Sequence, residues 1–251
     1  MDINILQLAG LFAVGIGAGL LNALAGGGSF ITVPLLIFTG LEPTVANATN
    51  RLAVWLQSLF GTGKFSRMGY FPKKYCYTVA FPTAAGAMCG AYIATVIADA
   101  AFKKYFAFFM VLMTLFTFFK PDAKELKKDV DFTPKTFVLN VTAFFFIGLY
   151  SGFVQAGVGF LMIAGSVMSG LDMVRAHAVK LFLNLVAATV SVAIFIYAGK
   201  VLYLPAICMG AGMAIGAVTA ANVSVRVSNN FLKKLVSFVI VIFAVLLLVF
   251  K

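Results

Sequence analysis

Long apolar runs, separated by short breaks that contain glycine, proline or charged residues, divide the first half of the chain. Helices are predicted over residues 3–25, 42–65, 75–98 and 102–119, and a shorter apolar segment at 29–40 follows a run of glycines. An apolar helix of about 20 residues is long enough to cross the hydrocarbon core of a bilayer. Over the whole chain, the pattern predicts an all-α integral membrane protein with about 8–10 transmembrane segments.

The same pattern starts again after a polar stretch at residues 120–135, and the two copies match at an offset of 130 residues. One long duplication within a membrane protein is typical of transporters that are built from two related halves. We therefore predict two homologous halves, residues 1–119 and 136–251, joined by a polar linker at 120–135 that lies in the cytoplasm. Matching positions include Gly40 with Gly170, Glu42 with Asp172, Asn47 with His177, Gly69 with Gly199 and Gly86 with Gly216.

The second segment of each half, at residues 29–40 and 160–170, is too short for a regular crossing. A helix of 11 or 12 residues is roughly 17 Å long, against a hydrocarbon core of about 30 Å. Either these segments are re-entrant, which gives four spans per half with both halves facing the same way, or unwound glycine backbone completes each crossing. The second alternative gives five spans per half and inverted halves.

The distribution of Lys and Arg helps to choose between the two topologies. With five spans per half, 13 basic residues lie on one side and 4 on the other, whereas four spans give 11 and 6. Basic residues gather on the cytoplasmic side of membrane proteins. The steeper asymmetry favours inverted five-helix repeats, each with a short or broken second helix.

Composition and charge restrict the partners of the chain. Hydrophobic residues make up 62% of it and charged residues only 11%, whereas a soluble domain has about a quarter charged residues. The solvent around most of the chain is therefore the lipid bilayer. The formal charge of +11 comes from basic residues in short loops, as the positive-inside rule requires, so we expect no nucleic-acid partner.

The two glycine-containing breaks are the first candidate site. Each precedes a short apolar helix, and the start of a helix offers unpaired N–H groups and the positive end of the helix dipole to an anion. Alternatively, single glycines here serve only close packing or a sharp turn. The residues concerned are Asn22, Gly26, Gly27, Gly28 and Ser29 in the first half, and Gln155, Gly157 and Gly159 in the second.

Polar residues recur at helical spacing on the following long helix of each half. Asn47, Asn50, Arg51, Gln57 and Ser58 do so in the first half, and His177, Lys180 and Asn184 in the second. Residues three and four apart share one face of a helix. We expect Asn50, Arg51, His177, Lys180 and Asn184 to contact the substrate.

Arg51 and Lys180 are both predicted to lie roughly 12 Å from the start of their helix. A cation at that depth is costly unless it faces a cavity or a partner. All eight acidic residues fall at helix ends or in the linker, so the negative charge is expected to come from the substrate. The alternative is that one or both side chains extend to the lipid headgroups.

The first break and the residues after it resemble a known family. The run NALAGGGSFITVPLL from Asn22 to Leu36, with GLEP from Gly40 and ANATNR ending at Arg51, is similar to the TauE/SafE sulfite exporter family. In the branch that it resembles most, a lysine stands at the position of Arg51. The second half departs from the motif, because the run from Gln155 to Phe160 lacks both the triple glycine and the Val-Pro pair.

The resemblance implies transport of sulfite, organosulfonates or other small anions across the bacterial inner membrane by a multi-pass protein. Together with the residue pattern, it predicts an exporter that works by alternating access around a cationic site near the middle of the membrane. An anion channel is the main alternative. A membrane-embedded enzyme would need a nucleophile and a base, or a metal set, at this depth; we predict no catalytic residue, metal or cofactor.

Overall fold

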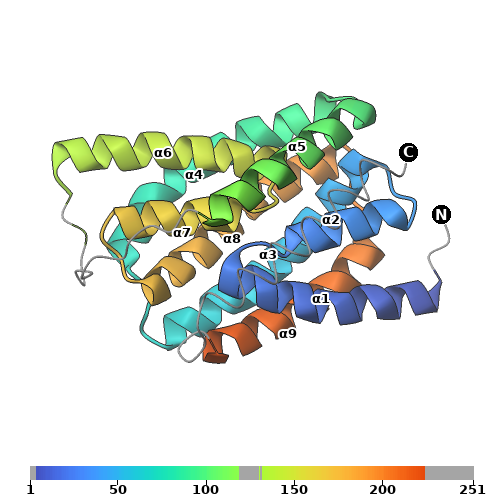
Figure 1. Cartoon of the computed structure of the whole chain (residues 1–251), viewed down its shortest axis with the longest axis horizontal. Helices are drawn as coiled ribbons and strands as arrows, with labels where there is room; N and C mark the ends of the chain where they lie inside the picture. The colour runs from blue at the N-terminus through green and yellow to red at the C-terminus, as the bar shows by residue number, and fades with distance from the viewer. Residues whose placement is uncertain (1–3, 119–129, 131, 224–251) are drawn as a thin grey trace.

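A computed structural model describes residues 4–118, 130 and 132–223, and in these residues the chain forms nine α-helices and no strand (Figure 1). The predicted all-α class is therefore confirmed. In the first half the helices are α1 (Ile5–Ala25), α2 (Ser29–Phe38), α3 (Pro43–Arg67), α4 (Lys73–Val96) and α5 (Asp99–Phe118). In the second half they are α6 (Pro134–Phe153), α7 (Val158–Met168), α8 (Met173–Tyr197) and α9 (Tyr203–Val223).

Five of the described helices, α1, α4, α6, α8 and α9, are long and apolar enough to cross a bilayer. Helix α3 is as long as α8, at 25 residues each, but its polar residues lower its hydropathy. Helices α2 and α7 have only 10 and 11 residues, as predicted, and are too short to span a core of about 30 Å. The chain is an all-helical, multi-pass membrane protein.

The starts of α3 and α8 are capped differently from each other. Asp172 accepts a hydrogen bond of 2.8 Å from the backbone N–H of Arg175, as expected for an acid that begins a helix. Glu42 stands at the equivalent position before α3, but its side chain makes no capping hydrogen bond within the described structure. Asp99, at the start of α5, accepts the N–H of Thr44 instead.

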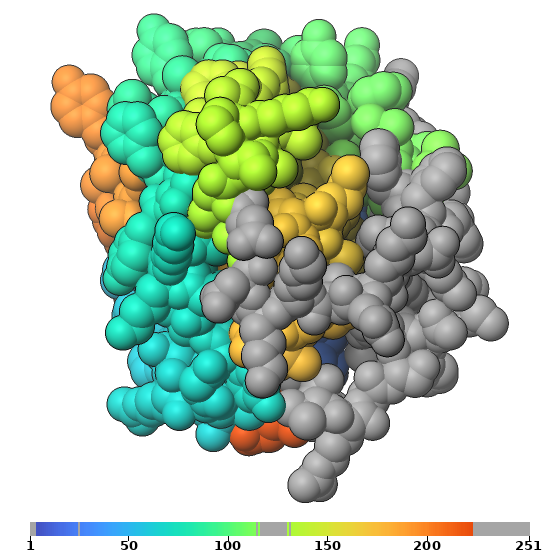
Figure 2. Space-filling model, turned by 90° about the vertical axis from the view of Figure 1, so that its left-hand side faces the viewer, coloured from blue at the N-terminus to red at the C-terminus, as the bar shows by residue number. Residues whose placement is uncertain are grey.

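Glycines bring two pairs of helices into backbone contact. A Cβ atom on Gly15 or Gly19 of α1 would lie within 2.5 Å of the backbone of Met209 or Met213 of α9. The pair α4 and α6 packs equally closely, and Figure 2 shows side chains of α6 directly against those of α4. In both pairs, residues later in one helix contact residues later in the other, so the two helices run in the same direction. Small residues allow this approach in membrane proteins.

Helices α3 and α8 run in opposite directions along each other. Trp55 donates a hydrogen bond of 2.9 Å to the hydroxyl of Thr189. Further along α3, a Cβ atom on Gly61 would lie 3.1 Å from the Cδ1 atom of Leu181, which comes earlier in α8. We call the contact between these two helices the α3–α8 seam.

The hairpins α1–α2 and α6–α7 enter the bundle from opposite ends and meet in its middle (Figure 1). A Cβ atom on Gly159 would come within 2.5 Å of the Cα atom of Gly26, so the two backbones touch. A Cβ atom on Gly157 would meet the ring of Phe30 at 2.5 Å. The two glycine-containing breaks therefore form one structural unit at the centre of the protein.

The helix bounds agree with the predicted duplication but do not establish it. Helices α3 and α8 differ by 130 residues at both ends, and α4 and α9 begin at residues 73 and 203. Most of the predicted linker, residues 120–129 and 131, and the segment 224–251 lie outside the described residues. The two halves and the linker remain predictions.

Candidate functional site

The first break contributes backbone rather than side chains to the middle of the protein. Gly26 ends α1 in the left-handed conformation, with φ of 85°, which a glycine adopts without strain. Gly28 and Ser29 are buried, and no side chain caps the start of α2 in the described part of the protein. Asn22 donates a hydrogen bond of 2.7 Å to Gln57 of α3, which fixes the end of α1.

The second break carries a buried polar side chain in an unfavourable backbone conformation. Gln155 has a φ of 65°, and it is the one non-glycine residue with positive φ among those described. Its side chain is 2% exposed, and neither amide atom has a hydrogen-bond partner within the described residues. A left-handed conformation at such a residue costs about 1–2 kcal/mol. Strain of this kind, together with unpaired polar atoms, is commonly found at functional sites.

Arg51 of α3 is completely buried, next to the end of α6 that leads into the second break. Its Nη1 atom lies 3.4 Å from the hydroxyl of Ser151 in α6, which is long for a hydrogen bond. Its Nε and Nη2 atoms have no partner in the part of the chain that the structure describes, and no described carboxylate forms an ion pair with it. A buried guanidinium with two unpaired nitrogen atoms can donate a hydrogen bond to an anionic oxygen from each.

Asn47 lies one helical turn before Arg51 and faces the same neighbour. It donates a hydrogen bond of 3.1 Å to the carbonyl of Phe153, the last residue of α6. Its own side-chain oxygen has no partner among the described residues. Beside the end of α6, the side chains of Asn47 and Arg51 therefore both have polar atoms without hydrogen-bond partners among the described residues.

Lys180 of α8 is also completely buried, but its ammonium group has protein partners. It donates hydrogen bonds of 2.7 and 2.5 Å to the carbonyls of Asn22 and Ala23, in the last turn of α1. These carbonyls form the negative end of the helix dipole, which favours a cation. We expected two buried cations that only a substrate could neutralise; the end of α1 already provides partners for one of them.

Gly159 makes this contact possible. A Cβ atom there would lie 3.1 Å from the Cδ atom of Lys180, so any side chain would interfere with the path of the lysine. His177 and Asn184 are 4% and 2% exposed and lie within one turn of Lys180. The His177 Nδ1 and Asn184 Oδ1 atoms have no partner within residues 4–118 and 132–223.

Asn50, unlike Arg51 beside it, has protein hydrogen-bond partners for both polar atoms of its side chain. It accepts a hydrogen bond of 2.6 Å from Thr32 and donates one of 3.2 Å to Ser29, which ties α3 to the first turn of α2. The hydroxyl groups of Ser29 and Thr32 are therefore already engaged. These contacts explain Asn50 without a ligand.

The predicted residues thus converge on the meeting point of the two hairpins but divide into two groups. Arg51 and Gln155 have incomplete hydrogen bonds near the end of α6, whereas Lys180, His177 and Asn184 lie near the end of α1. Sequence reasoning missed Ser151, the neighbour of Arg51, and Ser191, a buried α8 residue whose hydroxyl also has no partner among the described residues. No pattern in the sequence distinguishes these two serines from others.

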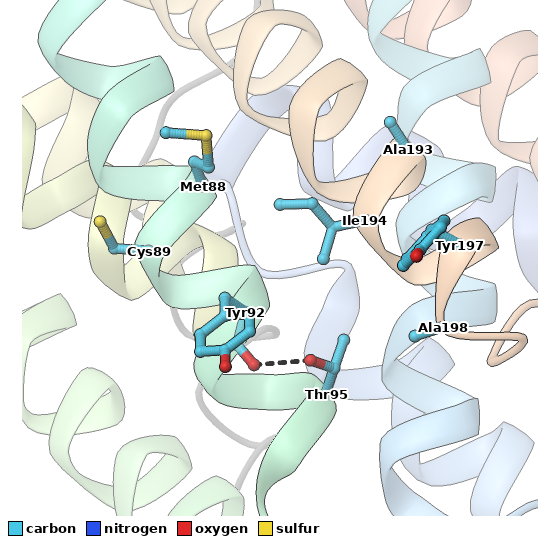
Figure 3. Close-up of a pocket in the computed structure, with 8 residues that line it drawn as sticks. All are labelled: Met88, Cys89, Tyr92, Thr95, Ala193, Ile194, Tyr197 and Ala198. Atoms are coloured by element: carbon cyan, nitrogen blue, oxygen red, sulfur yellow. Dashed lines mark hydrogen bonds between the residues drawn. The ribbon is translucent and has the colours of Figure 1, made fainter.

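A groove of about 750 Å³ lies elsewhere, between the second halves of α4 and α8 (Figure 3). None of the predicted site residues lines it. Its lining is almost entirely apolar, and the hydroxyl of Thr95 is engaged with the carbonyl of Tyr92. The described lining of the groove therefore offers no charged side chain to a small anion.

Residues 11–247 match the family described as sulfite exporter TauE/SafE, so the match covers nearly the whole chain. The chain belongs to the TauE/SafE family. This confirms the resemblance found in the sequence. Members of this family are described as exporters, which indicates a membrane transporter rather than an enzyme.

Three curated relatives carry compatible names. A probable membrane transporter protein, ORF9 of Sinorhizobium sp, is 30% identical over 98% of this chain and 94% of its own length. A probable membrane transporter protein of Haemophilus influenzae is 29% identical over 94% of this chain and 92% of its own. The Escherichia coli protein YfcA, also named a probable membrane transporter protein, is 26% identical over 84% and 78%. No solved structure matches the chain significantly.

Proposed function

We propose that this membrane transporter carries small anions, such as sulfite or organosulfonates, out of the cell by alternating access. The bacterial inner membrane is its proposed location, in keeping with the bacterial sources of its relatives. The substrate class is suggested by the family description, and the environment of Arg51 supports it.

The observation that carries the proposal is the state of the Arg51 side chain. It is completely buried, and in the described structure its Nε and Nη2 atoms lack hydrogen-bond partners. Removing a charged group from water is costly unless the charge is paired. A sulfite or sulfonate group brings both the missing negative charge and oxygen atoms that accept from two guanidinium nitrogens at once.

Alternating access is supported by the closed state of this site and by the helix directions. Arg51 and Lys180 are both 0% exposed, so the substrate can reach them only after helices move apart. The antiparallel α3–α8 seam also supports inverted halves: if α3 and α8 are equivalent, their opposite directions require opposite orientations in the membrane.

Export fits the electrical driving force. Each unit of negative charge that leaves the cell gains about 2.3 kcal/mol per 100 mV of membrane potential. All acidic residues lie at helix ends or in the predicted linker, so the sequence places no carboxylate at bilayer depth to carry a coupling proton. We therefore propose that the potential drives the exit, and that collapsing it slows the flux.

The deciding experiment measures binding and flux on the same preparation. The purified protein is heated with sulfite, methanesulfonate, sulfate or acetate, because a ligand that binds only the folded state raises the melting temperature. Efflux of the stabilising anion from proteoliposomes is then followed with and without a membrane potential. Stabilisation by none of these anions, or a flux that does not respond to the potential, contradicts the proposal.

Arg51→Gln should abolish both the stabilisation and the efflux. Arg67→Gln is the matched control, since Arg67 lies in the last turn of the same helix and is exposed. An Arg51→Gln variant with wild-type affinity rejects the site.

An anion channel is the alternative that shares a cationic lining. The complete burial of Arg51 and Lys180 favours the transporter, because a conducting channel needs a continuous open path. Turnover separates them: a transporter should show exchange that is stimulated by anion on the opposite side and saturates at a low rate.

A further inference from the structure

The α3–α8 seam contains more unpaired polar atoms than the Arg51 site accounts for. The Ser58 hydroxyl in α3 and the Ser191 hydroxyl in α8 have no partner within the described residues, and the same holds for the side-chain oxygen of Asn184. All three side chains are at most 2% exposed. Buried polar groups normally find partners, and each exception calls for an explanation.

The direction of the two helices places these atoms at two levels. The contact between Gly61 and Leu181 serves as the reference point. Ser58 lies three residues before Gly61 in α3, and Asn184 lies three residues after Leu181 in α8. Arg51 lies ten residues before Gly61, and Ser191 lies ten residues after Leu181. Antiparallel helices of equal rise keep such positions at about the same level. Ser58 therefore lies near the level of Asn184, and Arg51 near the level of Ser191.

The level of Ser58 and Asn184 also lies close to the second buried cation. Lys180 precedes Asn184 by four residues, so the two share one face of α8. Its ammonium group donates to the carbonyls of Asn22 and Ala23 at the end of α1. A cation that keeps its partners still contributes a positive field at this level. The Ser58 hydroxyl can donate a hydrogen bond to an oxyanion there. Asn184 donates through its Nδ2 group, after a half-turn of the side-chain amide, because its unpaired Oδ1 atom only accepts.

We propose that the α3–α8 seam holds a second binding position for the transported oxyanion, at Ser58 and Asn184, about 10 Å from Arg51 along the helices. This inference rests on the proposed function. The anion binds first at Arg51 and then passes to the weaker, uncharged pair before it leaves. A single buried guanidinium would hold the anion too firmly, because passage requires sites that an ion can both enter and leave.

The proposal separates binding from flux. Ser58→Ala and Asn184→Leu should leave the melting-temperature increase by methanesulfonate within about twofold of wild type, because Arg51 is intact. Efflux of methanesulfonate from proteoliposomes should fall about tenfold, the effect of losing roughly 1.4 kcal/mol of stabilisation at the second position. Arg51→Gln should lose both.

Ser166→Ala is the matched control. Ser166 is equally buried, but its hydroxyl donates to the carbonyl of Met162 in its own helix, so we expect wild-type flux. Ser58→Ala should also keep the melting temperature of the unliganded protein, because its hydroxyl bonds to nothing described. This separates a role in transport from a role in folding.

Three outcomes overturn the second position. Wild-type flux in both Ser58→Ala and Asn184→Leu shows that the anion does not stop there. Loss of the methanesulfonate-induced increase in these variants, to the extent seen in Arg51→Gln, shows one site instead of two. If the wild-type protein neither binds nor moves methanesulfonate or sulfite, the proposed function itself fails, and this inference with it.

Discussion

The side-chain nitrogen of Lys180 lies 2.7 Å from the backbone carbonyl oxygen of Asn22, to which it donates a hydrogen bond. The two residues are 158 positions apart in the sequence, and their contact joins α8 to the end of α1. Arg51, the other buried cation, has only a long contact of 3.4 Å with Ser151. The two cations are therefore predicted to differ in what they contribute to stability.

Lys180→Met and Arg51→Met should change the stability of the unliganded protein differently. The lysine variant removes the ammonium donor from the buried Ala23 carbonyl and leaves the Asn22 carbonyl with only the backbone N–H of Gly26, which we expect to cost about 2 kcal/mol. The arginine variant removes a buried charge whose desolvation is poorly compensated, so stability should stay the same or rise. Thermal unfolding of both variants in the same detergent measures the difference. An equal decrease in both melting temperatures would show that Arg51 is as well paired as Lys180.

The contact between Gly26 and Gly159 should tolerate no side chain. In Gly159→Ala, the new Cβ atom would lie 2.5 Å from the Cα atom of Gly26 and 3.1 Å from the Lys180 side chain. The hairpins would have to separate, and we expect loss of transport with a clearly lower melting temperature. In Gly17→Ala, no described atom lies within 4 Å of the new Cβ, so this control should be neutral or stabilised by about 0.5–1 kcal/mol. A transport-competent Gly159→Ala variant would refute the close approach.

Gln155 is predicted to lower the stability of the folded protein while contributing to anion transport. Gln155→Gly and Gln155→Ala both remove the amide, but only glycine relieves the left-handed backbone at φ of 65°. The glycine variant should therefore be more stable than the alanine variant by about 1 kcal/mol. Both should show reduced anion efflux, because both lose the buried amide. If both variants transport at the wild-type rate, the amide has no part in the site.

Much of the fold could be predicted because the apolar pattern is strong. The starts of α2 at Ser29 and of α3 at Pro43 follow directly from the glycine run and from the Gly40–Pro43 turn. Lipid as solvent requires every backbone group to bond within its own helix, so long apolar runs allow little besides helices. The predicted bounds therefore lie within a few residues of those observed.

The site was predictable in its residues but not in its contacts. Spacing alone placed Arg51 and Lys180 on the polar faces of their helices, yet it could not reveal that the end of α1 serves Lys180 and not Arg51. That difference depends on how two hairpins far apart in the sequence pack. Capping shows the same limit: Glu42 precedes α3, but Asp99, 55 residues from Thr44, supplies the hydrogen bond.

The proposed inverted halves predict that equivalent positions lie on opposite sides of the membrane. Phe38 ends α2 and Met168 ends α7, they differ by 130 residues, and both are exposed, at 45% and 81%. Single cysteines at these positions, in a chain whose Cys76, Cys89 and Cys208 are replaced by alanine, should react with a membrane-impermeant maleimide from opposite sides. In intact cells we expect labelling at 38 and none at 168 until the membrane is permeabilised, because the steeper distribution of basic residues places both termini outside. Labelling of both cysteines from the same side would instead require four spans per half with both halves facing the same way, and the antiparallel seam between α3 and α8 would then contradict their equivalence.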